Sequence, residues 1–427
     1  MKSNRLVIVD GVRTPFTKAG TDLAALGADE LGRLVVNALL TRTGLDPELV
    51  DEVIFGCVAQ PVDAANVARV IALRSGIPES VPAITVQRNC ASGCEAITLA
   101  QQKMRAGTGS VFIVGGAESM SNIPLLFKQG TAEKFGRLTR AKSLGQRLKL
   151  FANFRPSDFQ PRVGLLLGLT DPVCGMNMGE TAEILAREYG ISREEQDAFA
   201  LQSHKRAVAA RERLAEEISP AFLARKASAV VADNGPRENQ SIEALAKLKP
   251  VFDKRTGSVT AGNASQVTDG AVALLVMSEE KAEQLGLSPL GTLSGFAYAG
   301  CDPARMGLGP AFAIAEAEKE TGLKLDDADV IEINEAFAAQ TIAVQRSAKS
   351  EAFARKFLNR ERALGEIPDQ KLNVNGGAIA LGHPVGATGA RIVLSSLKEL
   401  RRRNAKRALV TLCVGGGQGA ALWLERN

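Results

Sequence analysis

The sequence predicts an α/β protein built from two related halves, each a mixed sheet covered by helices on both faces. Three observations support this fold class. At 427 residues the chain is longer than one hydrophobic core usually supports, so at least two domains are expected. Strand-like runs alternate with helical patterns both early and late in the chain. A set of landmarks also recurs in the same order far along the sequence.

The internal repeat begins with a helical pattern that ends in Thr-Gly-Leu and leads into a strand-like run. These features stand at Leu26-Gly27, Thr43-Gly44-Leu45 and 53–55, and again at Leu308-Gly309, Thr321-Gly322-Leu323 and 330–333. A turn and a glycine-opened helix follow in both copies, at Ser92-Gly93 and at Thr388-Gly389. Any two strand–helix–strand units look alike, but the ordered recurrence favours two halves related by a pseudo-twofold axis. Such an axis brings the two helix starts face to face.

A different region, about 122 to 251, separates the two copies. Within it, the segment 128–162 is strongly basic, with nine cations against Glu133 and Asp158, a net charge of 9 − 2 = +7. Because the whole chain carries only +5, the rest sums to 5 − 7 = −2. The basicity is therefore local, and we do not expect a nucleic-acid partner.

Composition excludes several classes of protein. The chain is 45% hydrophobic and 23% charged, as in ordinary globular proteins, and no apolar run approaches the ~18 residues of a membrane span. No signal-peptide pattern precedes the strand-like 6–9, and the C-terminal Glu425-Arg426-Asn427 is not a peroxisomal address, so a cytoplasmic location is expected. The six cysteines and two histidines lack metal-ligand spacing, and no metal site is expected.

Cys90 is the first candidate for chemistry, in Gln87-Arg88-Asn89-Cys90-Ala91-Ser92-Gly93. A cysteine on a tight turn before a helix lies where free backbone N–H groups and the helix dipole stabilise a thiolate. The same N–H groups can hold an oxyanion on an acyl carbon attached to that sulfur. A small buried cysteine at a crowded turn explains the local segment equally well.

His383, in Gly382-His383-Pro384, occupies the position in the second copy that Cys90 has in the first. The pseudo-symmetry therefore predicts that His383 lies within reach of Cys90, and cysteine–histidine pairing is the usual way to activate a thiol. His204 falls on an amphipathic helix with a charged face, and we expect it at the surface. The segment 115–119 has no GxGxxG pattern, so a dinucleotide site is only weakly supported.

Two further candidates stand at strand ends, where α/β folds place ligands. Cys413 follows a strand-like run and precedes three glycines, which permit close approach of a substrate to backbone N–H groups. From the local sequence it is as well explained as a buried strand-end cysteine. Asn334, in Asn334-Glu335-Ala336-Phe337, suits the positioning of a water molecule or carbonyl and not proton transfer.

Seven motifs in order resemble those of the thiolase family over essentially the whole chain. They are Asn-Cys-Ala-Ser-Gly at 89–93, Gly-Gly-Ala-Glu-Ser-Met at 115–120, Asn-Met-Gly at 177–179, Thr-Ala-Gly-Asn-Ala-Ser at 260–265, Asn-Glu-Ala-Phe at 334–337, Gly-His-Pro at 382–384 and Cys-Val-Gly-Gly-Gly at 413–417. The resemblance implies two pseudo-symmetric halves, each with a five-stranded mixed sheet, and an inserted loop domain. The halves expected are 1–121 with 252–285, and 286–427, with 122–251 as the insert.

The resemblance also implies roles for individual residues. Cys90 is the nucleophile, and His383 activates it and forms one oxyanion hole with a water held by Asn334. Cys413 is the acid–base thiol, and the N–H groups of Cys90 and Gly415 form the second oxyanion hole. The pantetheine and acyl pocket is implied to be lined by Met178, Ser265, Met306, Ala336 and Phe337.

The implied reaction is thiolytic cleavage of a 3-ketoacyl-CoA to acetyl-CoA and a shortened acyl-CoA, as in fatty-acid β-oxidation, with acyl-Cys90 as intermediate. Coenzyme A and acyl-CoA are substrates, and no permanently bound cofactor is expected. Alternatives are an acetoacetyl-CoA thiolase working toward condensation, a decarboxylating ketoacyl synthase, and a non-catalytic lipid-binding protein on the same fold. The synthase lacks the second cysteine, and the non-catalytic protein usually lacks a catalytic residue, whereas both are present in this chain.

The insert resembles the corresponding loop in the β-subunits of β-oxidation trifunctional complexes, through the segment Ser143 to Phe151. Those subunits pair with an α-subunit that carries hydratase and dehydrogenase activities. Leu144, Leu148 and Phe151 have helical spacing, which suits a partner-binding or membrane-surface helix within 128–162, or a helix that covers the active-site entrance. Asn334 stands where those β-subunits usually carry histidine, which favours a free homodimer or homotetramer.

Overall fold

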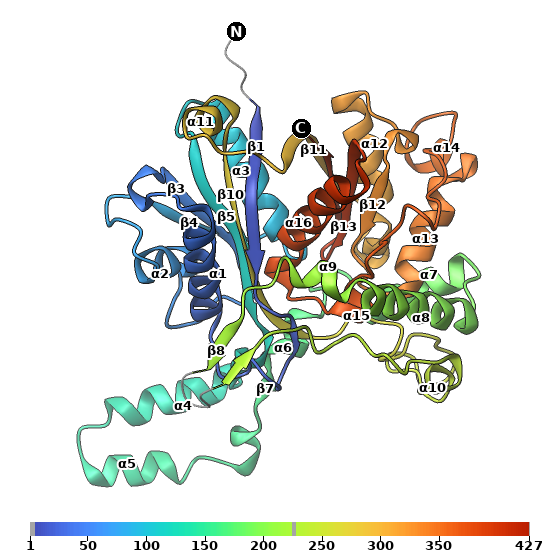
Figure 1. Cartoon of the computed structure of the whole chain (residues 1–427). Helices are drawn as coiled ribbons and strands as arrows, with labels where there is room; N and C mark the ends of the chain where they lie inside the picture. Colours follow the sequence, from blue (N-terminus) through green and yellow to red (C-terminus); the bar gives the residue numbers. More distant parts are fainter. Residues whose placement is uncertain (1–4, 224–227, 427) are drawn as a thin grey trace.

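A computed structural model describes residues 5–223 and 228–426 of the chain, and its largest feature is one mixed sheet made of two half-sheets (Figure 1). The first half-sheet has the order β4-β3-β5-β10-β1, formed by Ala83–Val86, Glu52–Gly56, Val111–Ser119, Thr268–Ser278 and Leu6–Arg13. The second has the order β11-β14-β13-β12, formed by Gly291–Gly300, Gln418–Glu425, Arg407–Val414 and Val330–Ile333. The α/β class and the mixed sheets are confirmed.

Strand directions repeat between the halves. β3 is parallel to β4 and β5, and β12 is parallel to β13, whereas β10, β11 and β14 pair antiparallel with their neighbours. In the second half the fifth position is held by a single parallel bridge between Leu372 and Ile331. Two residue pairs, Val7 with Thr292 and Ile8 with Gly291, join the half-sheets into one.

Helices form three layers around the half-sheets. α3 (Ser92–Arg105) and α16 (Val385–Arg403) lie between them, in one hydrophobic core with alternate residues of both. The outer face of the first half is covered by α1 (Ala28–Thr43) and α2 (Val67–Arg74), and that of the second by α12 (Gly309–Thr321) and α13 (Ala338–Ala348). Because side chains alternate along a strand, each half-sheet fills both cores at once.

The two central helices meet at their N-terminal turns, as the repeat predicts. A Cβ atom at Gly93 would lie 2.6 Å from the backbone nitrogen of Ala390 and 3.1 Å from the carbonyl oxygen of Gly386. Only glycine fits at this distance, because any side chain would push the helices apart. The Ser-Gly and Thr-Gly pairs of the sequence therefore mark the contact between the halves.

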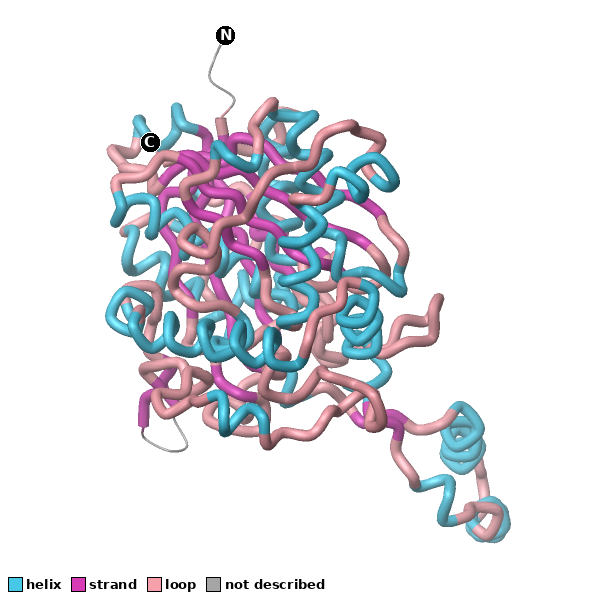
Figure 2. Tube along the Cα trace, turned by 90° about the vertical axis from the view of Figure 1, so that its right-hand side faces the viewer, coloured by secondary structure: helices cyan, strands magenta, loops and turns pink. Residues whose placement is uncertain are grey.

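The insert falls into two parts. Its second part packs on the body through α7 (Met178–Glu188), α8 (Arg193–Ala209), α9 (Arg211–Ala215), α10 (Ile242–Ala246) and the β8–β9 pair (Ala221–Leu223, Ser228–Val230). Its first part is a hairpin of α4 (Gln129–Arg140) and α5 (Leu144–Phe151), and it projects from the body in both views (Figures 1 and 2). The base of the hairpin is the β6–β7 pair (Leu125–Leu126, Arg162–Val163), followed by α6 (Gly164–Gly168).

The remaining short elements are β2 (Thr17–Lys18), α11 (Glu279–Gln284), α14 (Glu351–Phe357) and α15 (Ala378–Leu381). Among the residues described, none of the helices combines the length and the apolar character that crossing a membrane requires.

His204 is buried, so the expectation that it lies at the surface is wrong. It lies on α8 with 2% of its surface exposed, and its Nδ1 accepts a hydrogen bond from the backbone N–H of Arg237 at 3.3 Å. α8 is packed by α10, α13 and α15, so a side chain next to charged residues in sequence still faces protein. Burial, and then the positive charge of Arg237, lowers the pKa of His204 to about 4.

Candidate active site

The Cys90 turn follows the edge strand β4 and precedes α3. Asn89 has a φ of +42°, a left-handed conformation that asparagine tolerates better than most residues. The Ser92 hydroxyl accepts from the Arg88 N–H at 2.8 Å and donates to the Asn89 carbonyl at 2.7 Å, which closes the turn. The sequence therefore places Cys90 immediately before the first turn of a helix.

Side chains of the same turn reach the second half of the molecule. The Asn89 amide donates to the carbonyl oxygen of Gly415 at 2.8 Å. The Arg88 guanidinium lies 4.0 Å from the ring centre of Tyr298, pairs with Glu95 at 2.6 Å and donates to Gln418 Oε1 at 3.1 Å. Cys90 is thus fixed against β11 and the turn that follows β13.

The Cys90 thiol is protonated at neutral pH. Burial raises its pKa to about 11, although hydrogen bonds from the backbone N–H groups of Gly415 and of Cys90 itself act in the opposite direction. The charge of Glu118 raises the pKa further. The two N–H groups point at the sulfur, so they lie where an oxyanion on an attached acyl carbon would need donors.

His383 offers an unprotonated ring nitrogen. Its Nδ1 lies 2.6 Å from the Thr388 hydroxyl, which itself donates to the Pro384 carbonyl at 3.0 Å. Because that hydroxyl hydrogen is already used, the proton between the two side chains belongs to Nδ1, and Nε2 keeps its lone pair. Burial, and then Arg391, lowers the pKa of His383 to about 4, so the ring is neutral at rest.

The backbone of His383 is held by the start of β10. Its N–H is shared between the Gln266 carbonyl and the Thr268 hydroxyl, both at 3.1 Å. Asn334 lies beside the ring, with its Nδ2 3.5 Å from His383 Nε2. Asn334 is 1% exposed, and its Oδ1 accepts no hydrogen bond from the residues that the structure describes, so this oxygen is available to a bound group.

Cys413 lies at the end of β13 and is fully buried. Burial, followed by the nearby Cys90 and Cys301 thiols, raises its pKa well above the usual range. The charge of Cys90 is among the causes of the raised pKa of Cys413, so the two thiols lie near each other. The arrangement therefore combines a thiol, a second thiol and a neutral imidazole.

An apolar cluster, referred to below as the apolar wall, surrounds Cys413. Met306, Ala336 and Phe337 pack in one cluster with Cys413, and Met178 lies at its edge. The Ser265 N–H donates to the Ala336 carbonyl at 2.9 Å. A Cβ atom at Gly415 would lie 3.3 Å from Met178 Sδ, so the turn after β13 also borders this wall. Met178, Met306, Ala336 and Phe337 thus pack with Cys413, and Ser265 binds the backbone of one of them.

Sequence reasoning missed two polar residues that hold the site together. Thr388 fixes the His383 tautomer, and its only signal was its place in the first turn after Gly-His-Pro. Glu118 is fully buried, and its carboxylate accepts from the backbone N–H of Gly386 at 2.8 Å. A charged residue at the end of an otherwise apolar strand was the available signal for Glu118.

This geometry supports one class of chemistry. A thiol and an imidazole with a free lone pair, on turns whose helices touch, are the groups that a covalent acyl intermediate requires, and the N–H donors stabilise the tetrahedral oxyanion. A second thiol near the first can give and take a proton. Among the described residues no cluster of histidine, cysteine, aspartate or glutamate has the arrangement of a metal site.

Comparisons with known proteins agree over the whole chain. The family models for the thiolase N-terminal and C-terminal domains match residues 6–280 and 287–426. The chain is 42% identical to the 3-ketoacyl-CoA thiolase of Yersinia enterocolitica and 43% identical to that of Pectobacterium carotovorum, over 99% of this chain and 97% of each relative.

Solved structures are similar in fold as well as in sequence. The acetyl-CoA acetyltransferase of Bacillus anthracis has a TM-score of 0.87 at 39% identity and covers 100% of both chains. The human mitochondrial 3-ketoacyl-CoA thiolase in complex with CoA has a TM-score of 0.85 at 37% identity, covering 100% of this chain and 99% of that one.

Proposed function

The chain belongs to the thiolase family and is an acyltransferase with CoA as a substrate, and from this premise we propose the role of each residue. The reaction is the CoA-dependent cleavage of a 3-ketoacyl-CoA to acetyl-CoA and a shortened acyl-CoA. One observation carries the assignment of roles. Cys90 and His383 lie on the turns before α3 and α16, which touch at Gly93 and Gly386, and Cys413 lies near the Cys90 sulfur.

The first half-reaction starts from a neutral pair. His383 Nε2 takes the proton of Cys90, and the sulfur attacks the 3-keto carbon of the substrate. The N–H groups of Cys90 and Gly415 stabilise the resulting oxyanion. The carbon–carbon bond then breaks, the Cys413 thiol protonates the acetyl-CoA enolate, and the acyl group stays on Cys90.

The second half-reaction transfers the acyl group to CoA. Cys413, left as a thiolate, takes the thiol proton of the incoming CoA, whose sulfur attacks the thioester carbon on Cys90. The tetrahedral intermediate collapses with Cys90 as leaving group, and His383 returns its proton. Two half-reactions through one covalent intermediate give ping-pong kinetics. Run backward, the same steps are a condensation of two acyl-CoA molecules.

Asn334 and the apolar wall position the thioester. The free Oδ1 of Asn334 suits a water molecule that, with protonated His383, donates to the thioester oxygen whose enolate forms. Met178, Met306, Ala336, Phe337 and Ser265 border the same space, which suits the pantetheine arm and the acyl chain.

Thiolysis of a series of 3-ketoacyl-CoA substrates, from acetoacetyl-CoA upward, tests this function. We expect CoA-dependent cleavage by the wild type and none by the Cys90→Ala protein. Activity limited to acetoacetyl-CoA would instead favour the short-chain enzyme working toward condensation. Consumption of a malonyl thioester with release of carbon dioxide would support the ketoacyl synthase, and undiminished cleavage by Cys90→Ala would overturn the assignment.

The enzyme is also proposed to be a homodimer or homotetramer. β4 pairs only with β3 among the described residues, so one edge of the large sheet is open. Ile84 on this strand is 39% exposed, and an open edge with apolar side chains is a common dimerisation surface. Light scattering on purified protein tests this, and a monomer at micromolar concentration contradicts it.

A cytoplasmic location is likewise a proposal, to be tested by cell fractionation.

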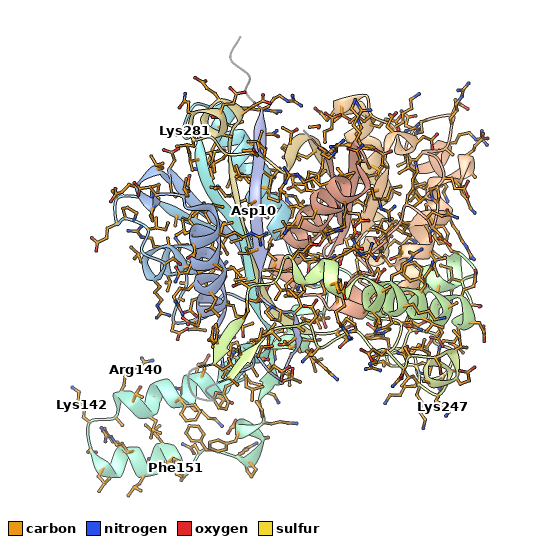
Figure 3. The ribbon with its side chains drawn as sticks, in the orientation of Figure 1. Asp10, Arg140, Lys142, Phe151, Lys247 and Lys281 are labelled. Carbon is orange, nitrogen blue, oxygen red and sulfur yellow. The ribbon has the colours of Figure 1, made fainter. Side chains whose placement is uncertain are left out.

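The hairpin of α4 and α5 is proposed as an interaction surface, for the hydratase/dehydrogenase α-subunit or for a membrane surface. Leu144, Leu148 and Phe151 expose 73%, 64% and 59% of their surface, and Figure 3 shows Phe151 on the projecting hairpin with Arg140 at the opposite helix. A cavity of about 450 Å³ between the two helices is lined by Arg137, Arg140, Ala141, Gln146, Lys149, Leu150 and Asn153. The hairpin projects from the body, so these exposed side chains are accessible to a partner.

Replacing Leu148 by glutamate tests the hairpin. We expect thiolysis of acetoacetyl-CoA within about twofold of wild type, because surface substitutions away from a site usually change little. Binding to vesicles that contain anionic lipid, or recovery of a dehydrogenase subunit from the native host, should be lost. Val231→Glu, at another exposed apolar residue, is the control. Wild-type protein that binds neither vesicles nor a dehydrogenase subunit contradicts the proposal.

A further inference from the structure

Glu118 carries a buried carboxylate that the reaction steps above do not use. It lies near the end of β5 and is fully buried, and no lysine or arginine among the described residues forms an ion pair with it. Its oxygens accept from the backbone N–H groups of Val58 at 3.1 Å, Ala59 at 2.9 Å and Gly386 at 2.8 Å. The Cys57 thiol is a fourth donor at 3.7 Å. A buried charge that is satisfied mainly by backbone is costly, so its presence calls for a reason.

The four donors come from both halves of the molecule. Cys57, Val58 and Ala59 follow β3 in the first half, whereas Gly386 is the second residue of α16 in the second half. Gly386 comes three residues after His383, so the carboxylate binds the first turn of the helix that begins next to the base. A negative charge at that place interacts favourably with the helix dipole and with its unpaired N–H groups.

Packing around this contact leaves no room for adjustment. A Cβ atom at Gly386 would lie 2.9 Å from Glu118 Oε2 and 2.9 Å from the Gly56 carbonyl oxygen. A Cβ atom at Gly56 would lie 2.8 Å from the Gly386 carbonyl oxygen. The backbones at Gly56 and Gly386 are thus in direct contact where the halves touch, and Glu118 makes a polar interaction across that contact.

We propose that Glu118 is a positioning residue for thiolysis: its carboxylate fixes the first turn of α16, and with it His383, against the half that carries Cys90. The proposal rests on the proposed function, because it assigns no new reaction. Glu118 does not exchange a proton with the substrate. It sets the relative position of base and nucleophile, for which an error of about 1 Å can cost about 100-fold in rate.

The charge of Glu118 has a second consequence, at Cys90. Burial is the main cause of the raised pKa of the Cys90 thiol, the N–H groups of Gly415 and Cys90 act against it, and the Glu118 carboxylate from β5 adds to it. Burial raises the pKa of Glu118 itself, while its three backbone N–H donors favour the ionised carboxylate. The carboxylate therefore adds to the effect of burial, which keeps Cys90 protonated until His383 accepts the proton during attack.

Two substitutions distinguish the positioning role of Glu118 from the effect of its charge. Glu118→Gln keeps the shape but replaces one acceptor oxygen with a donor and removes the charge. Glu118→Asp keeps the charge but is too short to reach all of its donors. Asp51→Asn is the matched control, since Asp51 also accepts from two backbone N–H groups, of Ser110 at 2.7 Å and Val111 at 2.9 Å, at the start of the same strand β5.

Steady-state thiolysis of acetoacetyl-CoA and the pH profile of Cys90 alkylation by iodoacetamide are the readouts. For Glu118→Gln we expect a kcat about 100-fold lower with KM within about threefold, and an alkylation midpoint shifted to lower pH. For Glu118→Asp we expect kcat lowered by about tenfold or more, with the alkylation midpoint unchanged. Asp51→Asn should match wild type in both readouts.

A kcat within threefold of wild type for the glutamine variant overturns the proposal, and an unmoved alkylation midpoint overturns the effect of the Glu118 charge on Cys90. If Glu118→Gln does not fold, the aspartate variant decides, and a wild-type kcat in that protein overturns the proposal. A wild-type enzyme without thiolysis would refute the proposed function instead, while the alkylation profiles, which need no substrate, would still report on Glu118.

Discussion

Two strand–turn–helix units with the same packing carry different chemistry. In the first half the turn between β4 and α3 presents a thiol, and in the second half the turn before α16 presents an imidazole. The helices that follow these turns touch along Gly93 and Gly386, so neither unit is complete without the other. The comparison teaches that the shared framework supplies the position, whereas a few turn residues decide which unit is nucleophile and which is base.

The two turns also differ in how protein surroundings act on them. Burial raises the pKa of Cys90 to about 11 and lowers that of His383 to about 4, so both groups rest in their neutral forms. Desolvation disfavours the charged form of an acid and of a base alike, which moves the two pKa values in opposite directions. An ion pair therefore forms only as substrate is attacked, and not beforehand.

Removing the nucleophile should have the largest effect. Cys90→Ala eliminates the atom that carries the acyl group, and kcat/KM for acetoacetyl-CoA thiolysis should fall by about 10,000-fold or more. Cys94→Ala is the control, because Cys94 is buried four residues later on α3 and faces Gly389 and not the site. Comparable losses in both variants would mean that the turn responds to packing and not to nucleophilic chemistry.

Removing the base should cost less than removing the nucleophile. His383→Asn should lower kcat by about 1,000-fold, since general base catalysis contributes about 100- to 10,000-fold. His204→Asn, at the other histidine, should leave kcat nearly unchanged, because His204 lies on α8 and its ring hydrogen-bonds, among the described residues, to the backbone of Arg237 alone. Equal losses of kcat in the two variants would contradict the assignment of His383 as the base.

Removing the second thiol should distinguish the acid–base role of Cys413 from the nucleophilic role of Cys90. Cys413→Ala should lower kcat by about 100- to 1,000-fold, because the enolate and the CoA thiol then lack their acid and base. Alkylation of Cys90 by iodoacetamide should remain within about threefold, since its activation depends on His383. Loss of Cys90 alkylation in this variant would show that Cys413 acts on Cys90 and not on the substrate.

Acid should destabilise the protein through its buried histidines. The folded pKa values of His204 and His383 are about 4, below the unfolded value near 6.5, so their stability contribution is present above pH 6.5 and is lost as pH falls toward 4. Between pH 7 and pH 5 each should remove about 2 kcal/mol. Urea unfolding should show His204→Asn losing about 2 kcal/mol less than wild type, and equal losses would contradict the burial of His204.

Sequence reasoning reached the framework because the repeat and the glycine pairs are local features. It also gave the bounds of one helix well, since the expected apolar stripe from Leu144 to Phe151 is α5. It failed at His204, whose burial depends on α10, α13 and α15 packing around α8. Sequence reasoning missed Glu118 and Thr388 for a related reason. Their roles depend on partners that only the folded chain brings together, across the interface in one case and within one helical turn in the other.

The central claim is that Cys90 carries the acyl group, and trapping the intermediate tests it most directly. Wild-type protein is mixed with acetyl-CoA, quenched in acid, digested and analysed by mass spectrometry. We expect the mass of one acetyl group on the peptide that contains Cys90, and its disappearance when free CoA is added before the quench. An acetyl group on Cys413 or Cys301 instead, or no CoA-reversible adduct on any peptide, would contradict the account.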